Sequence, residues 1–212
     1  EAAGGVAETF KLLKSKCDHE VKARAAGLLA RLTTAPGSRG AATLRSAPGA
    51  PASLAQAAAA AAARTDKWAS IERDNVVRAL AGVLQGKDTT PETINEFLKR
   101  KGYELVLAQL PAPKRDLGSI TAQSVCQTPA NPPSANCAGN AAKIVLSALN
   151  SSDAEVRGAV ADTLIQREGL ERLVCALANY KEITVRKNCA VTLDQLQDSF
   201  MNSFPKHYIL LR

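Results

Sequence analysis

One apolar phrase recurs four times along this chain and constrains the fold more than any other feature. Its copies begin at Val21, Val76, Val156 and Val185, with apolar residues at offsets 0, 4, 5 and 8 and alanine at offset 5 every time. These offsets lie along one stripe of an α-helix, and a small residue in the stripe lets a neighbouring helix approach closely. Four copies predict a stacked helical repeat, a fold that usually binds rather than catalyses.

A second phrase places glycine directly before an apolar helix, at Gly102 and Gly169 and more loosely at Gly5. Glycine suits a tight turn between helices because it tolerates positive φ and close backbone approach. Gly5 and Gly169 each lie sixteen residues before the start of an apolar phrase. This equal distance predicts that one helix–turn–helix unit recurs, with a weaker copy at 141–149.

The composition favours an all-α protein. Of the 212 residues 46% are hydrophobic but only 4% are aromatic, whereas a β protein would be richer in aromatic and β-branched residues. Short polar turns separate the expected helices, and Asp18 and Asp153 are placed to cap the helices that follow. Thr90-Pro91 is a further helix start, since proline is favoured in the first turn.

Two stretches interrupt the repeat. Residues of about 33–56 and 111–140 are rich in small residues, glycine or proline, and we interpret both as long, mobile loops inserted between repeats of a single domain, 1–212. Arg39 and Arg45 in the first stretch are candidates for contact with an anionic surface. The apolar tail, 199–212, is expected either to close the open face of the last repeat or to anchor to a partner.

These phrases resemble armadillo repeats and, more loosely, HEAT repeats. The resemblance covers about two-thirds of the chain and is carried by three segments, 155–164, 169–177 and 185–193. It implies an irregular, armadillo-like, right-handed α-solenoid with two long loop insertions. The successive phrases lie 55, 80 and 29 residues apart, which departs widely from the regular period of the family.

Importin-α-like armadillo proteins bind extended peptides through recurrent tryptophan and asparagine residues on their third helices. Here Trp68 lies outside the apolar phrase and Asn188 is the asparagine inside it, so a receptor for nuclear-localisation signals is not expected. The pattern is also similar to armadillo-like exchange factors of Hsp70, although no residue singles that family out. Armadillo folds also serve as structural subunits in cilia, ribonucleoproteins and organellar complexes.

The residues that carry enzyme chemistry are few and scattered. The two histidines, His19 and His207, are far apart, and neither has a helix-spaced companion of the kind that binds a metal. A nucleophile pair of Cys17 and His19 is the remaining catalytic alternative, in a polar turn where the pairing is incidental. We therefore expect no enzyme activity, no metal and no cofactor.

The five cysteines form no spacing pattern and are odd in number, which favours reduced thiols. The alternative is a disulfide between Cys126 and Cys137, which flank a loop rich in proline and asparagine. No segment is apolar enough to span a membrane. We expect an intracellular protein, in the cytoplasm, with an organelle (after removal of a presequence) or a cilium as alternatives.

The leading hypothesis is a non-catalytic scaffold or structural subunit that binds protein partners, within a multi-subunit complex, through its helical-repeat surface. The alternatives are an RNA-associated repeat protein that uses its net charge of +7 against phosphate or another acidic surface, and an adaptor similar to Hsp70 cochaperones. The candidate contact residues are Arg78, Arg157, Arg186, Lys187, Asn188 and Tyr208.

Overall fold

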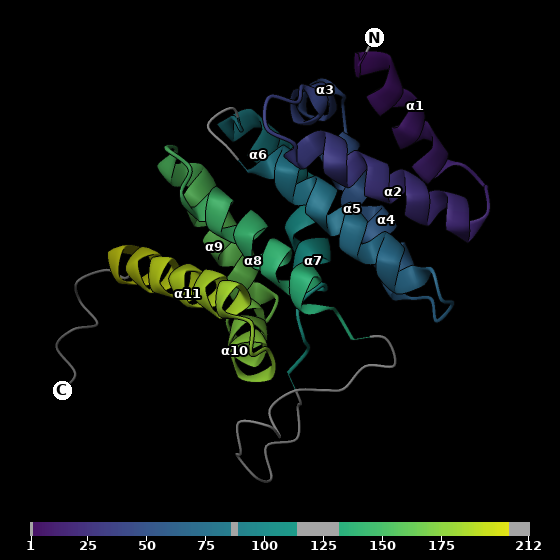
Figure 1. The fold of residues 1–212 in the computed structure, drawn as a ribbon. Coiled ribbons are helices and arrows are strands. Elements are labelled where there is room, and N and C mark those ends of the chain that lie inside the picture. The colour runs from purple at the N-terminus through teal and green to yellow at the C-terminus, as the bar shows by residue number, and fades with distance from the viewer. Residues whose placement is uncertain (1, 86–88, 114–131, 204–212) are drawn as a thin grey trace, which may run out of the picture.

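The computed structural model describes residues 2–85, 89–113 and 132–203, and within these ranges the secondary structure is entirely helical. The helices are α1 (Ala2–Lys14), α2 (His19–Thr34), α3 (Gly40–Ser46), α4 (Ala50–Ala62), α5 (Ala69–Leu84), α6 (Pro91–Lys99), α7 (Gly102–Leu107), α8 (Ala135–Leu149), α9 (Ala154–Gln166), α10 (Gly169–Asn179) and α11 (Ile183–Ser203) (Figure 1). The all-α prediction is confirmed.

Polar side chains fix where several helices begin. Asp18 accepts a hydrogen bond from the Glu20 N–H at the start of α2, and Asp153 accepts from the N–H groups of Glu155 and Val156 at the start of α9. Both predicted caps are therefore present. These side chains satisfy N–H groups that have no partner within the helix itself.

The same backbone junction occurs three times and defines the repeat unit. A residue with positive φ separates α3 from α4, α6 from α7, and α9 from α10; these residues are Gly49 (70°), Lys101 (57°) and Glu168 (57°). Two helices follow each junction, and the second of them is α5, α8 or α11. The chain thus contains the three-helix units α3–α5, α6–α8 and α9–α11, and α1–α2 match the last two helices of such a unit.

The last helices of the units form a row. α2 packs against α5, α5 against α8, and α8 against α11, and Figure 1 shows these four helices following one another across the molecule. α4 packs behind α5 and also contacts α7, so the second helices add another layer. The largest share of the buried side chains belongs to α5 and α8, which have a row neighbour on each side.

The structure corrects the assignment of the third apolar phrase. The phrase at Val156 lies in α9, a first helix that stands outside the row. The row position belongs to α8, which carries Cys137, Ala141, Ala142 and Val145 at the same four offsets, all fully buried. Measured along the row, the phrases begin 55, 61 and 48 residues apart. The repeat is therefore more even than the sequence spacing indicated.

Neighbouring row helices do not always bring the same positions of the phrase opposite each other. Asn188 in α11 donates to the Gly139 carbonyl of α8, and these two residues hold neighbouring places in their phrases. Between α2 and α5, by contrast, Gly27 lies against Asn75 and Gly82 lies against Thr33, a displacement of nearly two helical turns relative to the phrase. The close approach of α2 and α5 therefore depends on glycine as well as on the predicted alanine.

The prediction of a loop at 33–56 is wrong. This range holds the end of α2, all of α3 and the first half of α4, and Leu44 and Leu54 within it are fully buried. Glycine and proline here start helices: Gly49 adopts the junction conformation and Pro51 follows in the first turn of α4. Arg45 donates to the Val83 carbonyl, 3.0 Å away, and so stabilises the end of α5; Arg39 remains exposed.

The second expected insertion, 111–140, is also shorter than predicted at its far end, because α8 begins at Ala135. Its central part, 114–131, lies outside the described residues. The tail of 199–212 begins within α11, which runs to Ser203, and residues 204–212 lie outside the described part of the chain. The predicted role of the tail therefore stays a prediction.

Candidate protein-binding surface

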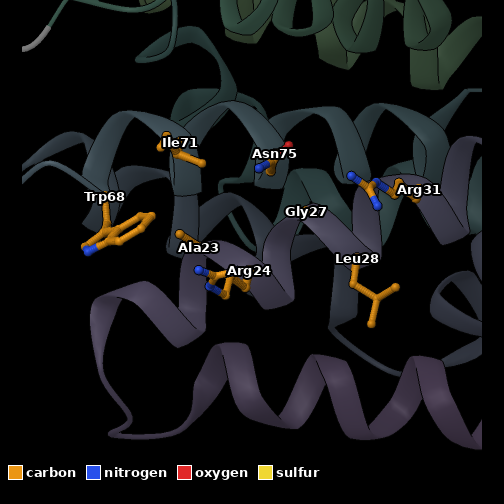
Figure 2. A pocket seen from close by; sticks show the side chains of 8 residues that line it. All are labelled: Ala23, Arg24, Gly27, Leu28, Arg31, Trp68, Ile71 and Asn75. Carbon is orange, nitrogen blue, oxygen red and sulfur yellow. The ribbon is translucent and has the colours of Figure 1, made fainter.

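A hollow of about 400 Å³ lies between the first two helices of the row. Figure 2 shows the side chains that line it: Ala23, Arg24, Gly27, Leu28 and Arg31 from α2, and Trp68, Ile71 and Asn75 from α5 or its N-terminal cap. Leu28 and Ile71 keep 47% and 46% of their surface exposed. Such exposure of aliphatic side chains within one depression is typical of a contact surface.

The absence of a side chain at Gly27 helps to keep this hollow open. A Cβ atom at this position would lie 3.4 Å from the Asn75 amide nitrogen and would meet the rest of α5 no more closely. The hollow therefore has room for a small side chain at Gly27, and side chains of α2 and α5 leave it open. The Asn75 side chain lines the hollow, and its amide carries both hydrogen-bond donors and an acceptor.

The charges around this hollow are unbalanced. Arg24 and Arg31 line it, and its lining contains no carboxylate. Arg24 is paired with Glu20, whose carboxylate is 2.6 Å away, but both side chains are largely exposed. The Lys67 ammonium also stands 5.1 Å from the centre of the Trp68 ring. The charged residues of the lining are therefore both arginines, and the Glu20 carboxylate beside the hollow offsets the charge of Arg24.

A second hollow, of about 340 Å³, continues this surface between α5 and α8. Its lining residues are Ile71, Asp74, Asn75, Arg78, Asn136 and Asn140. Ile71 and Asn75 line both hollows, so one surface extends across α2, α5 and α8. Asp74 accepts a hydrogen bond from the Ser134 hydroxyl at 2.6 Å, and burial raises the pKa of this carboxyl group.

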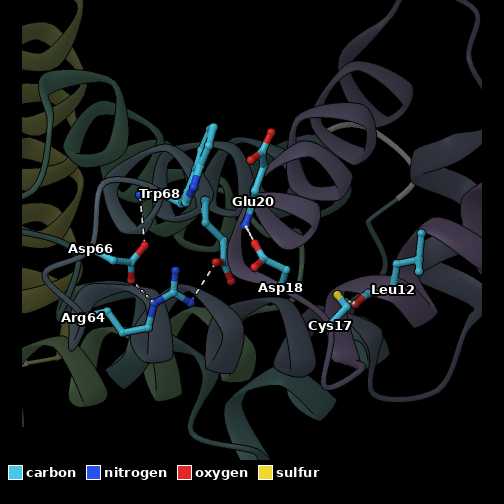
Figure 3. A network of polar contacts seen from close by, with 8 residues as sticks. Leu12, Cys17, Asp18, Glu20, Arg64, Asp66 and Trp68 are labelled. Atoms are coloured by element: carbon cyan, nitrogen blue, oxygen red, sulfur yellow. Dashed lines mark hydrogen bonds and ion pairs between the residues drawn. The ribbon is translucent and has the colours of Figure 1, made fainter.

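A polar network holds Trp68 in place (Figure 3). The backbone N–H of Trp68 donates to Asp66 at 3.0 Å. Arg64 forms ion pairs with Asp66 at 2.8 Å and with the buried Glu72 at 2.9 Å. The hydrogen bond from Arg64 lowers the pKa of Asp66. Burial alone lowers the pKa of Arg64, but hydrogen bonds to Asp66 and Glu72 outweigh it and raise that pKa. The turn between α4 and α5 is thereby fixed.

The candidate contact residues do not form one cluster. Arg78 lies on the surface just described, where its guanidinium donates to the Thr34 hydroxyl at 3.5 Å. Arg157 lies in α9 and donates to the Ser151 carbonyl at 2.6 Å. Of the three candidates in α11, Arg186 and Lys187 are exposed, whereas Asn188 is half-buried and bonded to α8. Tyr208 lies outside the described residues.

The predicted contact residues do not include four polar or aromatic residues of this surface, Trp68, Asn75, Asn136 and Asn140. Trp68 and Asn75 were passed over because they precede the phrase at Val76, and the other two because α8 was not placed in the row. A spacing signal was available. Trp68, Ile71 and Asn75 follow the helical pattern i, i+3, i+7, which places them on one face of α5.

The alternative nucleophile pair of Cys17 and His19 is not formed. The Cys17 thiol donates to the Leu12 carbonyl at 3.4 Å rather than to His19 (Figure 3). Cys17, Cys137 and Cys189 form no disulfide, so the alternative disulfide of Cys137 is not formed; Cys126 lies outside the described residues. Burial raises the pKa of Cys137 to about 12 and that of Cys189 to about 11.

The described residues contain no group of three or more His, Cys, Asp or Glu side chains that could hold a metal ion. No described helix is both long enough and apolar enough to cross a membrane.

No protein-family model matches the chain, and no curated protein matches it either. Among solved structures, the chain is similar to a designed armadillo repeat protein with 12% sequence identity and a TM-score of 0.43, over 89% of this chain and 98% of that one. This likeness is loose, so the fold assignment depends on the three-helix units and the row of their last helices. The chain has an armadillo-like helical-repeat fold.

Proposed function

We propose that this protein is a non-catalytic scaffold or structural subunit that binds a protein partner through the row surface, meaning the two hollows across α2, α5 and α8. The observation that carries this proposal is the continuity of the hollows, which share Ile71 and Asn75. A partner laid across three helices would bury the exposed aliphatic side chains together. The reduced thiols of Cys17, Cys137 and Cys189 support placing the protein inside the cell.

The experiment is affinity purification from the native source, with mass spectrometry and with and without nuclease. Wild-type protein is compared with Ile71→Lys and with the matched control Ile165→Lys. Ile71 and Ile165 are 46% and 40% exposed and lie in α5 and α9, so both changes add the same charge to a helix surface. We expect a stoichiometric protein partner that survives nuclease, is lost with Ile71→Lys and is retained with Ile165→Lys.

The other outcomes are decisive in different ways. A partner retained by both variants would place the contact away from the row surface. Recovery of RNA, with loss of all partners after nuclease, would favour the RNA-associated alternative, whose binding weakens steeply as salt rises. A monodisperse monomer with no recoverable partner would contradict the scaffold function itself.

A further inference from the structure

We propose that the hollow between α2 and α5 receives an apolar side chain from an acidic segment of the partner protein. This inference rests on the proposed function and deepens it by naming the chemistry of the bound segment. The occupant we infer carries one apolar residue with carboxylates on both sides of it. The order of side chains along α2 and the charges of the lining support it.

The α2 side of the hollow alternates in character along one helical face. Arg24, Leu28 and Arg31 follow the spacing i, i+4, i+7, so they form a single stripe with the leucine between two arginines. On the opposite side, Trp68 and Ile71 face this stripe from α5 (Figure 2). Leu28 thus lies between the two arginines on α2, whereas Trp68 and Ile71 lie beyond Arg24, toward the N-terminal ends of the two helices.

The size of the hollow suits a side chain. About 400 Å³ is at the lower end of the range of roughly 300–1,000 Å³ for ligand pockets. Insertion of an aliphatic or aromatic group would cover Leu28 and Ile71, which are otherwise nearly half exposed. Removal of that apolar surface from water favours binding.

The two arginines set the spacing of the acidic groups. Seven residues of α-helix separate Arg24 from Arg31, a rise of about 10 Å. An extended peptide covers this distance in about three residues. Side chains three residues apart in an extended segment point to opposite faces, but the long, exposed side chains of Arg24 and Arg31 can reach a carboxylate on either face, with the apolar residue between the two carboxylates in the sequence. Arg24 already pairs with Glu20 on the surface, and such exposed pairs exchange at little cost.

The same charges disfavour a basic segment. Lysine side chains in the hollow would meet Arg24, Arg31 and the nearby Lys67, and the Glu20 carboxylate beside the hollow is already paired with Arg24. Single-stranded RNA remains a competing anion, since Trp68 could stack on a base. The apolar middle of the stripe favours the peptide, and RNA is made an outcome of the test.

Trp68 provides a direct probe, because it is the single tryptophan of the chain and lines the hollow. The full chain is titrated with the tryptophan-free peptides GSESLESG, GSKSLKSG and GSESSESG, and with an eight-nucleotide oligouridine. We expect a saturable change in Trp68 fluorescence with GSESLESG. The basic peptide and the peptide without leucine should bind at least tenfold more weakly, and the acidic peptide should weaken as salt is added.

Two matched variants localise the effect. Gly27→Glu adds a carboxylate inside the hollow, where a Cβ would make only an ordinary contact. Gly158→Glu makes the same change in the interior of α9, in open space. We expect GSESLESG to bind at least tenfold more weakly to Gly27→Glu and unchanged to Gly158→Glu, with equal helical circular dichroism for both variants.

Several results would overturn the inference: no saturable change up to millimolar GSESLESG, equal or tighter binding of the basic peptide or of oligouridine, or full binding by Gly27→Glu. The proposed function fails separately. If Ile71→Lys loses a protein partner while the acidic peptide does not bind, the row surface is still the contact site and only the occupant is wrong.

Discussion

At the residue scale, positive φ and close backbone approach belong to different residues of a helix junction, although the sequence pattern placed both on one glycine. Positive φ falls on Lys101 and Glu168, each directly before the expected glycine. The glycines supply close approach instead: a Cβ at Gly169 would lie 2.7 Å from the Leu164 carbonyl oxygen. The phrase therefore identified the right turns, although the backbone conformation within them could not be derived from the glycine alone.

Replacement of Gly169 by alanine should destabilise the protein. The added methyl group must displace the end of α9, which costs about 1–3 kcal/mol as an overpacked contact. Gly158→Ala is the control, because it adds a methyl group in open space within α9 and should be neutral or stabilise by up to about 1 kcal/mol. Urea unfolding measures both. Equal effects would contradict the close contact at Gly169.

Lys101→Gly should stabilise the protein. Lys101 is exposed and holds a φ of 57°, a conformation that costs roughly 1–2 kcal/mol for a residue with a Cβ. Glycine relieves this strain, but it also increases the conformational entropy of the unfolded chain, which offsets part of the gain. We therefore expect the free energy of unfolding to rise by up to about 1 kcal/mol. Lys99→Gly, within α6, should instead lower stability. A loss of stability at Lys101 would contradict the junction geometry.

The buried thiols should respond to pH and to alkylation in a predictable order. Iodoacetamide at pH 8 should modify the partly exposed Cys17 before Cys137 or Cys189, which are fully buried, as peptide mass spectrometry can show. Burial raises the pKa of Cys137 to about 12 from an ordinary value of 9.0. The unfolded chain loses this proton first as the pH rises. The Cys137 thiol therefore leaves the free energy of unfolding unchanged below pH 9 and lowers it by about 1.4 kcal/mol per pH unit above pH 9.

The pH dependence is checked as a difference. Unfolding free energies of wild type and Cys137→Ala are measured between pH 7 and 11, because other groups also titrate there. The variant should be less stable at pH 7 but lose stability less steeply above pH 9. Parallel curves would show that the Cys137 thiol does not carry the effect.

At the element scale, the sequence predicted helix positions well and helix roles less well. The phrase correctly located α2, α5 and α11, but it also matched α9, since a first helix needs a buried stripe too. α8 was missed as a row helix, although it carries the four offsets of the phrase, because its copy starts with Cys137 instead of valine. Local periodicity indicates a buried stripe, but it does not indicate that α5 and α11 are the neighbours against which α8 packs.

The caps, in contrast, were predictable because they are local. Asp153→Ala should destabilise the protein by about 1 kcal/mol, since the N–H groups of Glu155 and Val156 lose their acceptor. Asp162→Ala, an exposed position within the same helix, is the control and should change stability by less than about 0.5 kcal/mol. Thermal unfolding compares them. Similar losses at both sites would argue against the cap.

At the scale of the whole molecule, position in the row decides what a repeated residue does. Ala142 of α8 and Ala190 of α11 both occupy offset 5 of the phrase, yet Ala142 is fully buried and Ala190 is exposed. The candidate site obeys the same logic, because its hollows exist only between adjacent row helices. Sequence periodicity gives the phrase but not the neighbours, and this is why Trp68 and Asn75 had to be found in the structure.

This difference gives a test of the row itself. Ala142→Leu forces three carbon atoms into the contact of α8 with its neighbours, where the Thr192 hydroxyl already donates to the Ala142 carbonyl at 3.4 Å. We expect a loss of about 1–3 kcal/mol from overpacking. Ala190→Leu makes the same change at the same phrase position and should stay within about 0.5 kcal/mol of wild type. Urea unfolding of both variants decides the matter: equal costs would mean that α8 is not packed within the row as described, because only burial distinguishes the two alanines.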